Sequence, residues 1–129
     1  MLVRTMPENS RVVALVDDLM FLSRITEAAA GLGLEVKKAR NVVELVEACR
    51  LSPRVVLVDL DSSRLPWAEG LAALRADPAL ANVPVVGFYG HVHTERARQG
   101  EQAGCTQVLA RGAFVQQLRR LLELPAAPG

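Results

Sequence analysis

The stretch that decides the fold is RVVLVDLDSS, residues Arg54–Ser63. Its apolar part, Val55–Val58, does not alternate between apolar and polar side chains, which is typical of a strand covered on both faces. The strand then ends on two carboxylates, Asp59 and Asp61. Because acidic side chains are almost never buried without partners, their place directly after an apolar strand calls for an explanation.

An earlier stretch has the same arrangement. Arg11–Val16 is a second, nearly continuous apolar run, and Asp17 and Asp18 follow it directly. In open parallel sheets, ligands bind beyond the carboxyl ends of the strands, near the point where the strand order reverses. We therefore expect Asp17, Asp18 and Asp59 to meet at one edge of a sheet.

Strand-like and helix-like segments alternate along the chain. The apolar runs expected to form strands are Arg11–Val16, Leu34–Ala39, Val55–Val58, Val83–Phe88 and Thr106–Ala110. Between them, apolar residues recur at helical spacing, first at Leu19, Leu22, Ile25, Ala29 and Leu32. Asn41 and Pro66 are typical helix starts, and Pro53 ends a helix. Five strands, each followed by a helix, predict a three-layer α/β fold with a doubly wound, five-stranded parallel sheet.

The chain has 129 residues, enough for one domain with a substantial core. We expect the domain at 11–124, after an N-terminal extension at 1–10 and before a flexible tail at 125–129. The net charge of +1 gives no general attraction to nucleic acid or to a membrane surface. No apolar run is long enough to span a bilayer, and the first residues lack the apolar core of a secretory signal. A cytoplasmic protein is the expectation.

Clustered carboxylates repel one another unless a positive group lies among them. Hard oxygen ligands suit Mg²⁺, which keeps several waters and pairs with phosphate oxygens. A magnesium site with one further carboxylate as nucleophile has the composition of an aspartyl-phosphate site. The alternative for each of Asp17, Asp18 and Asp59 is that it caps a helix or lies in solvent at the end of a strand.

The segments around these acids resemble the receiver domain of two-component response regulators, the CheY-like family. VVALVDD and VVLVDLD resemble the family's first and third strands, and NVPVVGFYG resembles the fourth. AGCTQVLARGAF resembles the segment around the fifth strand, so that the resemblance covers roughly residues 11 to 124. It implies a flavodoxin-like fold with strand order 2-1-3-4-5.

The resemblance also implies roles for single residues. Asp59 falls on the phospho-acceptor, and Mg²⁺ would be held by Asp17 or Asp18, by Asp59 and by a backbone carbonyl near Asp61. A histidine kinase or a downstream signalling protein would be the partner. Because no output domain follows in this sequence, the expectation is a stand-alone receiver in a two-component phosphorelay.

Three positions depart from the family pattern. Tyr89 lies where the family has Thr or Ser after the fourth strand, and its hydroxyl is much farther from the backbone. Arg111 and Gly112 replace the Lys and Pro after the fifth strand, and Arg is a larger, planar donor. The loop after Asp59 is longer than usual. The pattern predicts an atypical receiver, or pseudo-receiver, in which the metal ligands are kept and the switch residues are changed.

Two functions follow from these observations. One is a signalling module phosphorylated on Asp59, with self-phosphorylation and autodephosphorylation as its only enzymatic activity. The other is a phosphorylation-independent scaffold for protein interaction or dimerisation, with Asp59 neutralised by Arg111. The resemblance allows a homodimer through the last helix–strand–helix face, and no nucleic-acid or membrane partner is expected. A flavodoxin-like small-molecule binder is disfavoured because no phosphate-cradling glycine loop occurs, and His91 and His93 are too few ligands for zinc.

Overall fold

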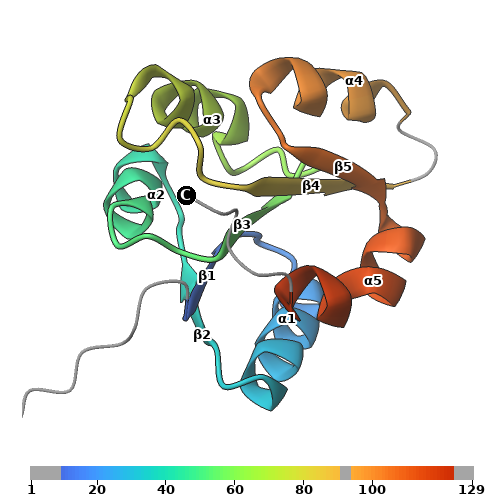
Figure 1. The fold of residues 1–129 in the computed structure, drawn as a ribbon. Helices are drawn as coiled ribbons and strands as arrows, with labels where there is room; N and C mark the ends of the chain where they lie inside the picture. Colours follow the sequence, from blue (N-terminus) through green and yellow to red (C-terminus); the bar gives the residue numbers. More distant parts are fainter. Residues whose placement is uncertain (1–9, 91–93, 124–129) are drawn as a thin grey trace, which may run out of the picture.

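The structure of the protein, a computed structural model, describes residues 10–90 and 94–123. Within these ranges strands and helices alternate along the chain (Figure 1). The strands are β1 (Arg11–Leu15), β2 (Glu35–Lys38), β3 (Val55–Asp59), β4 (Val85–Tyr89) and β5 (Gln107–Ala110). The helices are α1 (Leu19–Gly31), α2 (Val42–Cys49), α3 (Trp67–Ala76), α4 (Thr94–Ala103) and α5 (Arg111–Glu123). The alternation predicted from the sequence is confirmed.

The strands form one parallel sheet in the order β2-β1-β3-β4-β5. Figure 1 shows α1 and α5 on one face of the sheet and α2, α3 and α4 on the other. After β1 the chain first builds β2 on one side and then β3 on the other, so the strand order reverses between β1 and β3. This is the predicted doubly wound, flavodoxin-like fold. It places the carboxyl ends of β1 and β3 next to each other, with Leu15 paired to Val58.

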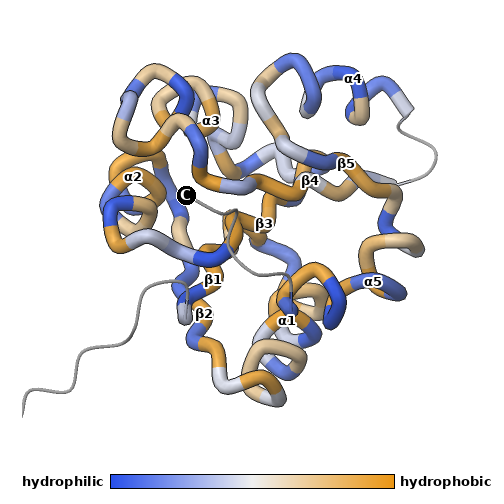
Figure 2. The backbone as a smooth tube through the Cα atoms, in the orientation of Figure 1, coloured by the Kyte–Doolittle hydropathy of each residue, from blue (hydrophilic) through white to orange (hydrophobic). Residues whose placement is uncertain are grey.

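Successive strand residues point into two different apolar layers. The layer beneath α2 and α3 includes Val13, Leu15, Val56, Val58, Leu60, Trp67, Leu71 and Leu74. The layer beneath α1 and α5 includes Val12, Ala14, Ile25, Leu57, Phe88, Phe114, Leu118 and Leu122. Figure 2 shows the central strands as largely hydrophobic. Both faces of the sheet are covered, which explains why β1 and β3 lack an apolar–polar alternation.

Helix α1 uses a somewhat different apolar face from the one that the spacing predicts. Ile25 and Ala29 are buried as expected, but the side chain of Leu19 is 74% exposed. Phe21, which was not among the predicted apolar positions, packs against the layer beneath α1 and α5 instead. Helical spacing does not tell which of two neighbouring apolar residues in a first turn will face the core. The outcome matters because Phe21 is part of the site described below.

The strand boundaries differ from the prediction by one or two residues, most at the start of β4. β4 begins at Val85 and not at Val83, because Pro84 has no N–H to donate to the ladder. The Pro84 carbonyl still accepts a 2.9 Å bond from the Val56 amide. The last helix begins at Arg111, directly after β5 and three residues before its first buried residue, Phe114. Arg111 therefore lies at the same edge of the sheet as the end of β3.

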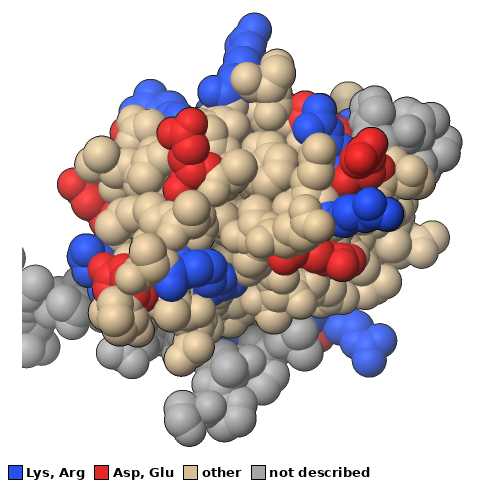
Figure 3. Space-filling view, turned by 90° about the horizontal axis from the view of Figure 1, so that it is seen from above, with Lys and Arg blue, Asp and Glu red and all other residues tan. Residues whose placement is uncertain are grey.

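Helix α4 is the most polar of the five, as Figure 2 shows, and Gly100 is its one buried residue. Seen from above, on the side where α3 and α4 lie in Figure 1, basic and acidic side chains are interspersed (Figure 3). That face has no large patch of a single charge. Among the described residues, no helix is both long and apolar enough to cross a membrane.

Candidate functional site

Asp59 is the last residue of β3 and is only 2% exposed. It is the one buried charged residue in the described part of the chain. The residues before and after it, Val58 and Leu60, are apolar and buried, and its register partner on β4 is Phe88. A carboxylate in this position loses most of its hydration, so the groups around it decide whether its charge is tolerated.

Two groups partly compensate the charge of Asp59. The backbone N–H of Asp61 donates to Asp59 Oδ1 at 3.0 Å. Arg111 Nη2 lies 3.7 Å from Asp59 Oδ2, which is an ion-pair distance but longer than a hydrogen bond. Arg111 therefore compensates the charge of Asp59 only in part and without a direct hydrogen bond.

Burial raises the pKa of the Asp59 carboxyl above its ordinary value of 3.8. The N–H of Asp61 and the guanidinium of Arg111 act in the opposite direction, and the nearby carboxylates of Asp61 and Asp17 raise the pKa further. The net shift is upward, so loss of hydration outweighs the two favourable contacts. A positive ion or an additional donor at this edge would stabilise the ionised form.

Arg111 is held by an aromatic ring. Its guanidinium carbon lies 4.6 Å from the centre of the Phe21 ring, within the range of a cation–π contact. Arg111 Nε is buried and has no hydrogen-bond partner among the described residues. The guanidinium thus keeps donor capacity that neither Asp59 nor the backbone uses.

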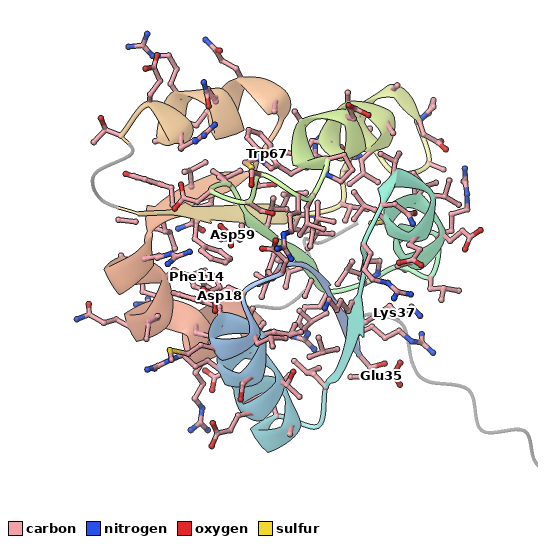
Figure 4. All side chains as sticks on the ribbon, turned by 180° about the vertical axis from the view of Figure 1, so that it is seen from behind. Asp18, Glu35, Lys37, Asp59, Trp67 and Phe114 are labelled. Carbon is pink, nitrogen blue, oxygen red and sulfur yellow. The ribbon has the colours of Figure 1, made fainter. Side chains whose placement is uncertain are left out.

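Asp17 and Asp18 follow β1 as predicted, but their side chains differ in role. Asp18 is the N-cap of α1: its Oδ1 accepts from the amides of Met20 and Phe21, at 2.9 and 3.2 Å. Asp17 acts on Asp59 through its charge. Figure 4 shows Asp18 and Asp59 at the same end of the sheet, near Phe114. The predicted convergence at one edge is found, and the helix-capping alternative describes Asp18.

Asp61 forms hydrogen bonds at the site through its side chain as well as its backbone. Its Oδ2 accepts from the amide of Gly90 at 2.6 Å, which ties the loop after β3 to the end of β4. The sequence had indicated only the backbone carbonyl of Asp61. In the same loop, the Ser62 hydroxyl accepts from the amides of Arg64 and Leu65, at 3.3 and 3.2 Å. The Ser62 side chain therefore stabilises the conformation of this loop from within.

Tyr89 is the last residue of β4, and its partly buried side chain packs against the layer beneath α2 and α3. Phe88, the register partner of Asp59, belongs to the opposite layer. Trp67 also belongs to the layer that Tyr89 packs against (Figure 4). The sequence assigned Tyr89 to the position of the family's Thr or Ser after the fourth strand, and the structure places it at the end of β4 with its side chain against this layer.

The residues at this edge could hold Mg²⁺ only if water molecules supplied most of its ligands. Within residues 10–90 and 94–123, no three His, Cys, Asp or Glu side chains form a group that could hold a metal ion. Mg²⁺ commonly uses one or two carboxylates, with waters and substrate phosphate completing its shell. Asp17 and Asp59 supply two such carboxylates, and one oxygen of Asp18 already caps α1. His91 and His93 lie outside the described residues.

Comparisons with known proteins agree with this fold. No family model and no curated protein sequence matches the chain. A response regulator from Hahella chejuensis has a TM-score of 0.73 at 17% identity, over 87% of this chain and 91% of that chain. The receiver domain of the sensor histidine kinase PA1611 from Pseudomonas aeruginosa, with magnesium in its active-site cleft, has a TM-score of 0.71 at 19% identity, over 88% and 93%.

The phosphorylated cyanobacterial phytochrome response regulator RcpA has a TM-score of 0.68 at 21% identity, and the likeness covers 88% of each chain. These identities are low, so the likeness shows the fold and not the activity. The chain has the fold of a response-regulator receiver domain, as the sequence resemblance implied.

Proposed function

We propose that this chain is a receiver-like signalling module of a two-component phosphorelay and that Asp59 is its phospho-acceptor. One observation carries the proposal: a buried carboxylate ends the central strand of a receiver fold, with the Arg111 guanidinium 3.7 Å away. A purely structural acid would gain little from a position where burial raises its pKa. Buried acids whose pKa is shifted by loss of hydration and by nearby charges are concentrated at functional sites.

The residues suit phosphoryl transfer. An oxygen of Asp59 attacks phosphorus, the bond from phosphorus to the donor nitrogen of a phosphohistidine breaks, and the imidazole leaves with the electron pair and takes up a proton. Arg111 faces the oxygens that gain charge, where a guanidinium is an effective donor. Asp17, Asp59 and the backbone carbonyl of Asp61 would hold Mg²⁺, which neutralises phosphoryl oxygens when it is bound. A histidine kinase would supply the phosphoryl group.

Treatment with acetyl phosphate and Mg²⁺, followed by intact mass spectrometry, tests this function. We expect one phosphoryl group on the wild-type chain and none on Asp59→Asn, which keeps the size of the side chain but removes the nucleophile. A second readout is the fluorescence of Trp67, the only tryptophan, during addition of beryllofluoride with Mg²⁺. No mass increase and no fluorescence change at millimolar Mg²⁺ would reject the proposal.

The second candidate is a phosphorylation-independent scaffold, in which the surface around α4, β5 and α5 binds a partner or a second copy. The 2.6 Å bond between the Asp61 carboxylate and the Gly90 amide favours it, because a donor at the active edge is already occupied. In that case Asp59→Asn should leave partner capture and oligomeric state unchanged. Light scattering and co-purification with a histidine kinase, on wild type and Asp59→Asn, distinguish the two candidates.

A further inference from the structure

We infer that Phe21 is a positioning residue: its ring holds the Arg111 guanidinium beside Asp59 but out of direct hydrogen bonding, so that Arg111 keeps donors for an oxyanion on Asp59. The oxyanion part of this inference rests on the function proposed above, whereas the placement of Arg111 does not. Neither the sequence pattern nor the likeness to receiver folds assigns a role to Phe21.

The two distances carry the inference together. The guanidinium carbon of Arg111 lies 4.6 Å from the Phe21 ring centre, and Arg111 Nη2 lies 3.7 Å from Asp59 Oδ2. An arginine free to choose its geometry next to a buried carboxylate would form two parallel hydrogen bonds with it. Arg111 instead shares its contacts between a ring and a carboxylate. Its Nε, buried and without a partner in the described chain, indicates that its donors are not matched to Asp59.

Phe21 has the support that a positioning residue needs. Its ring stacks on Phe88, with centroids 5.1 Å apart, and Phe88 stacks on Phe114 at 4.3 Å. These three residues come from α1, β4 and α5, so the ring is fixed by three elements of the core. The amide of Phe21 also donates to Asp18 Oδ1 at 3.2 Å, which fixes the start of α1. The ring is therefore a rigid surface on which a guanidinium can lie.

Loss of the ring has a specific consequence. In Phe21→Leu the guanidinium loses its cation–π contact, and the nearest favourable partner is the carboxylate of Asp59. A bidentate pair would occupy both the acceptor oxygens of Asp59 and the donors of Arg111. Acceptance of a phosphoryl group should then slow, even though both residues are still present.

The first test measures the rate of phosphorylation by acetyl phosphate with Mg²⁺. We expect Phe21→Leu to slow it about tenfold and Phe21→Trp, which keeps an aromatic face, to stay within about twofold of wild type. Leu22→Ala is the matched control, because Leu22 packs against the same layer from the same helix. It should cost stability without slowing the reaction. Equal rates for Phe21→Leu and wild type would overturn the inference.

A double-mutant cycle separates positioning from general packing. If Phe21 acts through Arg111, Phe21→Leu should have no further effect on the rate in the Arg111→Ala background. An unchanged tenfold loss in that background would mean that Phe21 acts through the core, and would reject a positioning role.

A third measurement does not depend on phosphorylation. In ¹⁵N-resolved NMR spectra, the Arg111 side-chain proton on Nε should be shifted by the ring current of Phe21 in wild type and in Leu22→Ala. The shift should vanish in Phe21→Leu, and the signal should become sensitive to Asp59→Asn. If acetyl phosphate never labels the wild type, the proposed function fails while this readout still decides whether Phe21 places Arg111. An Arg111 signal identical in wild type and Phe21→Leu would refute the placement.

Discussion

The carboxylate of Asp61 accepts a 2.6 Å hydrogen bond from the backbone amide of Gly90. The bond joins the loop after β3 to the residue that follows β4, across the edge of the sheet where Asp59 lies. Its length is that of a strong, charge-assisted bond. The negative charge of Asp61 also raises the pKa of Asp59. The side chain of Asp61 therefore influences the site in two ways: it links two loops, and its charge acts on Asp59.

Substitution of Asp61 separates these two effects. Asp61→Ala removes both, and we expect a loss of about 1–3 kcal/mol in the free energy of unfolding, because the Gly90 amide loses its acceptor. Asp61→Asn keeps an acceptor oxygen and should lose less. Hydrogen exchange of the Gly90 amide should be fastest in Asp61→Ala and intermediate in Asp61→Asn. Equal exchange in all three proteins would mean that the bond does not restrain this segment.

The raised pKa of Asp59 predicts how stability depends on pH. At neutral pH the folded protein carries a poorly compensated buried charge, so Asp59→Asn should raise the free energy of unfolding, by roughly 1 kcal/mol. As the pH falls through the folded-state pKa toward 3.8, folded Asp59 takes up a proton before the unfolded chain does, and wild type gains stability relative to the variant.

Urea unfolding monitored by Trp67 fluorescence checks this dependence, since Trp67 is buried in the core. The difference between Asp59→Asn and wild type should be largest near neutral pH and should shrink toward pH 4. A difference of the opposite sign at neutral pH would show that pairing with Arg111 outweighs the cost of burial.

The sequence predicted the sheet order and the meeting of Asp17, Asp18 and Asp59 at one edge because both depend on chain order and apolar runs. It did not predict which hydrogen bonds the individual carboxylate oxygens accept. The capping by Asp18 and the bond from Gly90 to Asp61 depend on side-chain rotamers and loop closure, which no spacing encodes.

The Phe21–Arg111 contact was missed for a related reason. It joins the first turn of α1 to the first residue of α5, and no spacing in the sequence pairs these two positions. The aromatic residue three positions after Asp18 was the available signal. The apolar spacing predicted that Leu19 would face the core, but Leu19 is exposed.

Arg75 lies away from the site and allows a test of what stabilises the fold. Its guanidinium donates to the carbonyls of Gly104, Ala81 and Val83 at 2.6–2.9 Å, which joins α3 to two loops. Arg75→Met should cost about 2–4 kcal/mol of unfolding free energy, because partly buried carbonyls lose their donors. Arg75→Lys should recover only part of this, since an ammonium cannot reproduce the planar fork.

The matched control for Arg75 is Arg119→Met. Arg119 is exposed, and within the described residues its one ion pair is an i,i+4 contact with Glu123 at 2.9 Å, so its replacement should change stability by less than about 0.5 kcal/mol. Comparable losses for Arg75→Met and Arg119→Met in urea unfolding would contradict a special role for the Arg75 bonds.

Leu60, the residue directly after Asp59, connects the site to α4. It is fully buried, and its side chain lies against the glycines of two elements, Gly87 of β4 and Gly100 of α4. A Cβ at Gly100 would come within 2.7 Å of Leu60 Cδ1. The polar helix α4 thus packs directly on the Leu60 side chain, because Gly100 has no side chain to hold the two apart.

Gly100→Ala should therefore destabilise the protein by about 1–3 kcal/mol, since overpacking outweighs the roughly 1 kcal/mol that alanine normally contributes within a helix. Gly112→Ala, in α5, is the matched control: a Cβ there meets no atom within 4 Å, so this variant should be neutral or slightly stabilising. Leu60→Ala should relieve the clash, so that the double variant Leu60→Ala with Gly100→Ala is more stable than the sum of the single effects predicts. Strict additivity in urea unfolding would mean that α4 does not rest on Leu60.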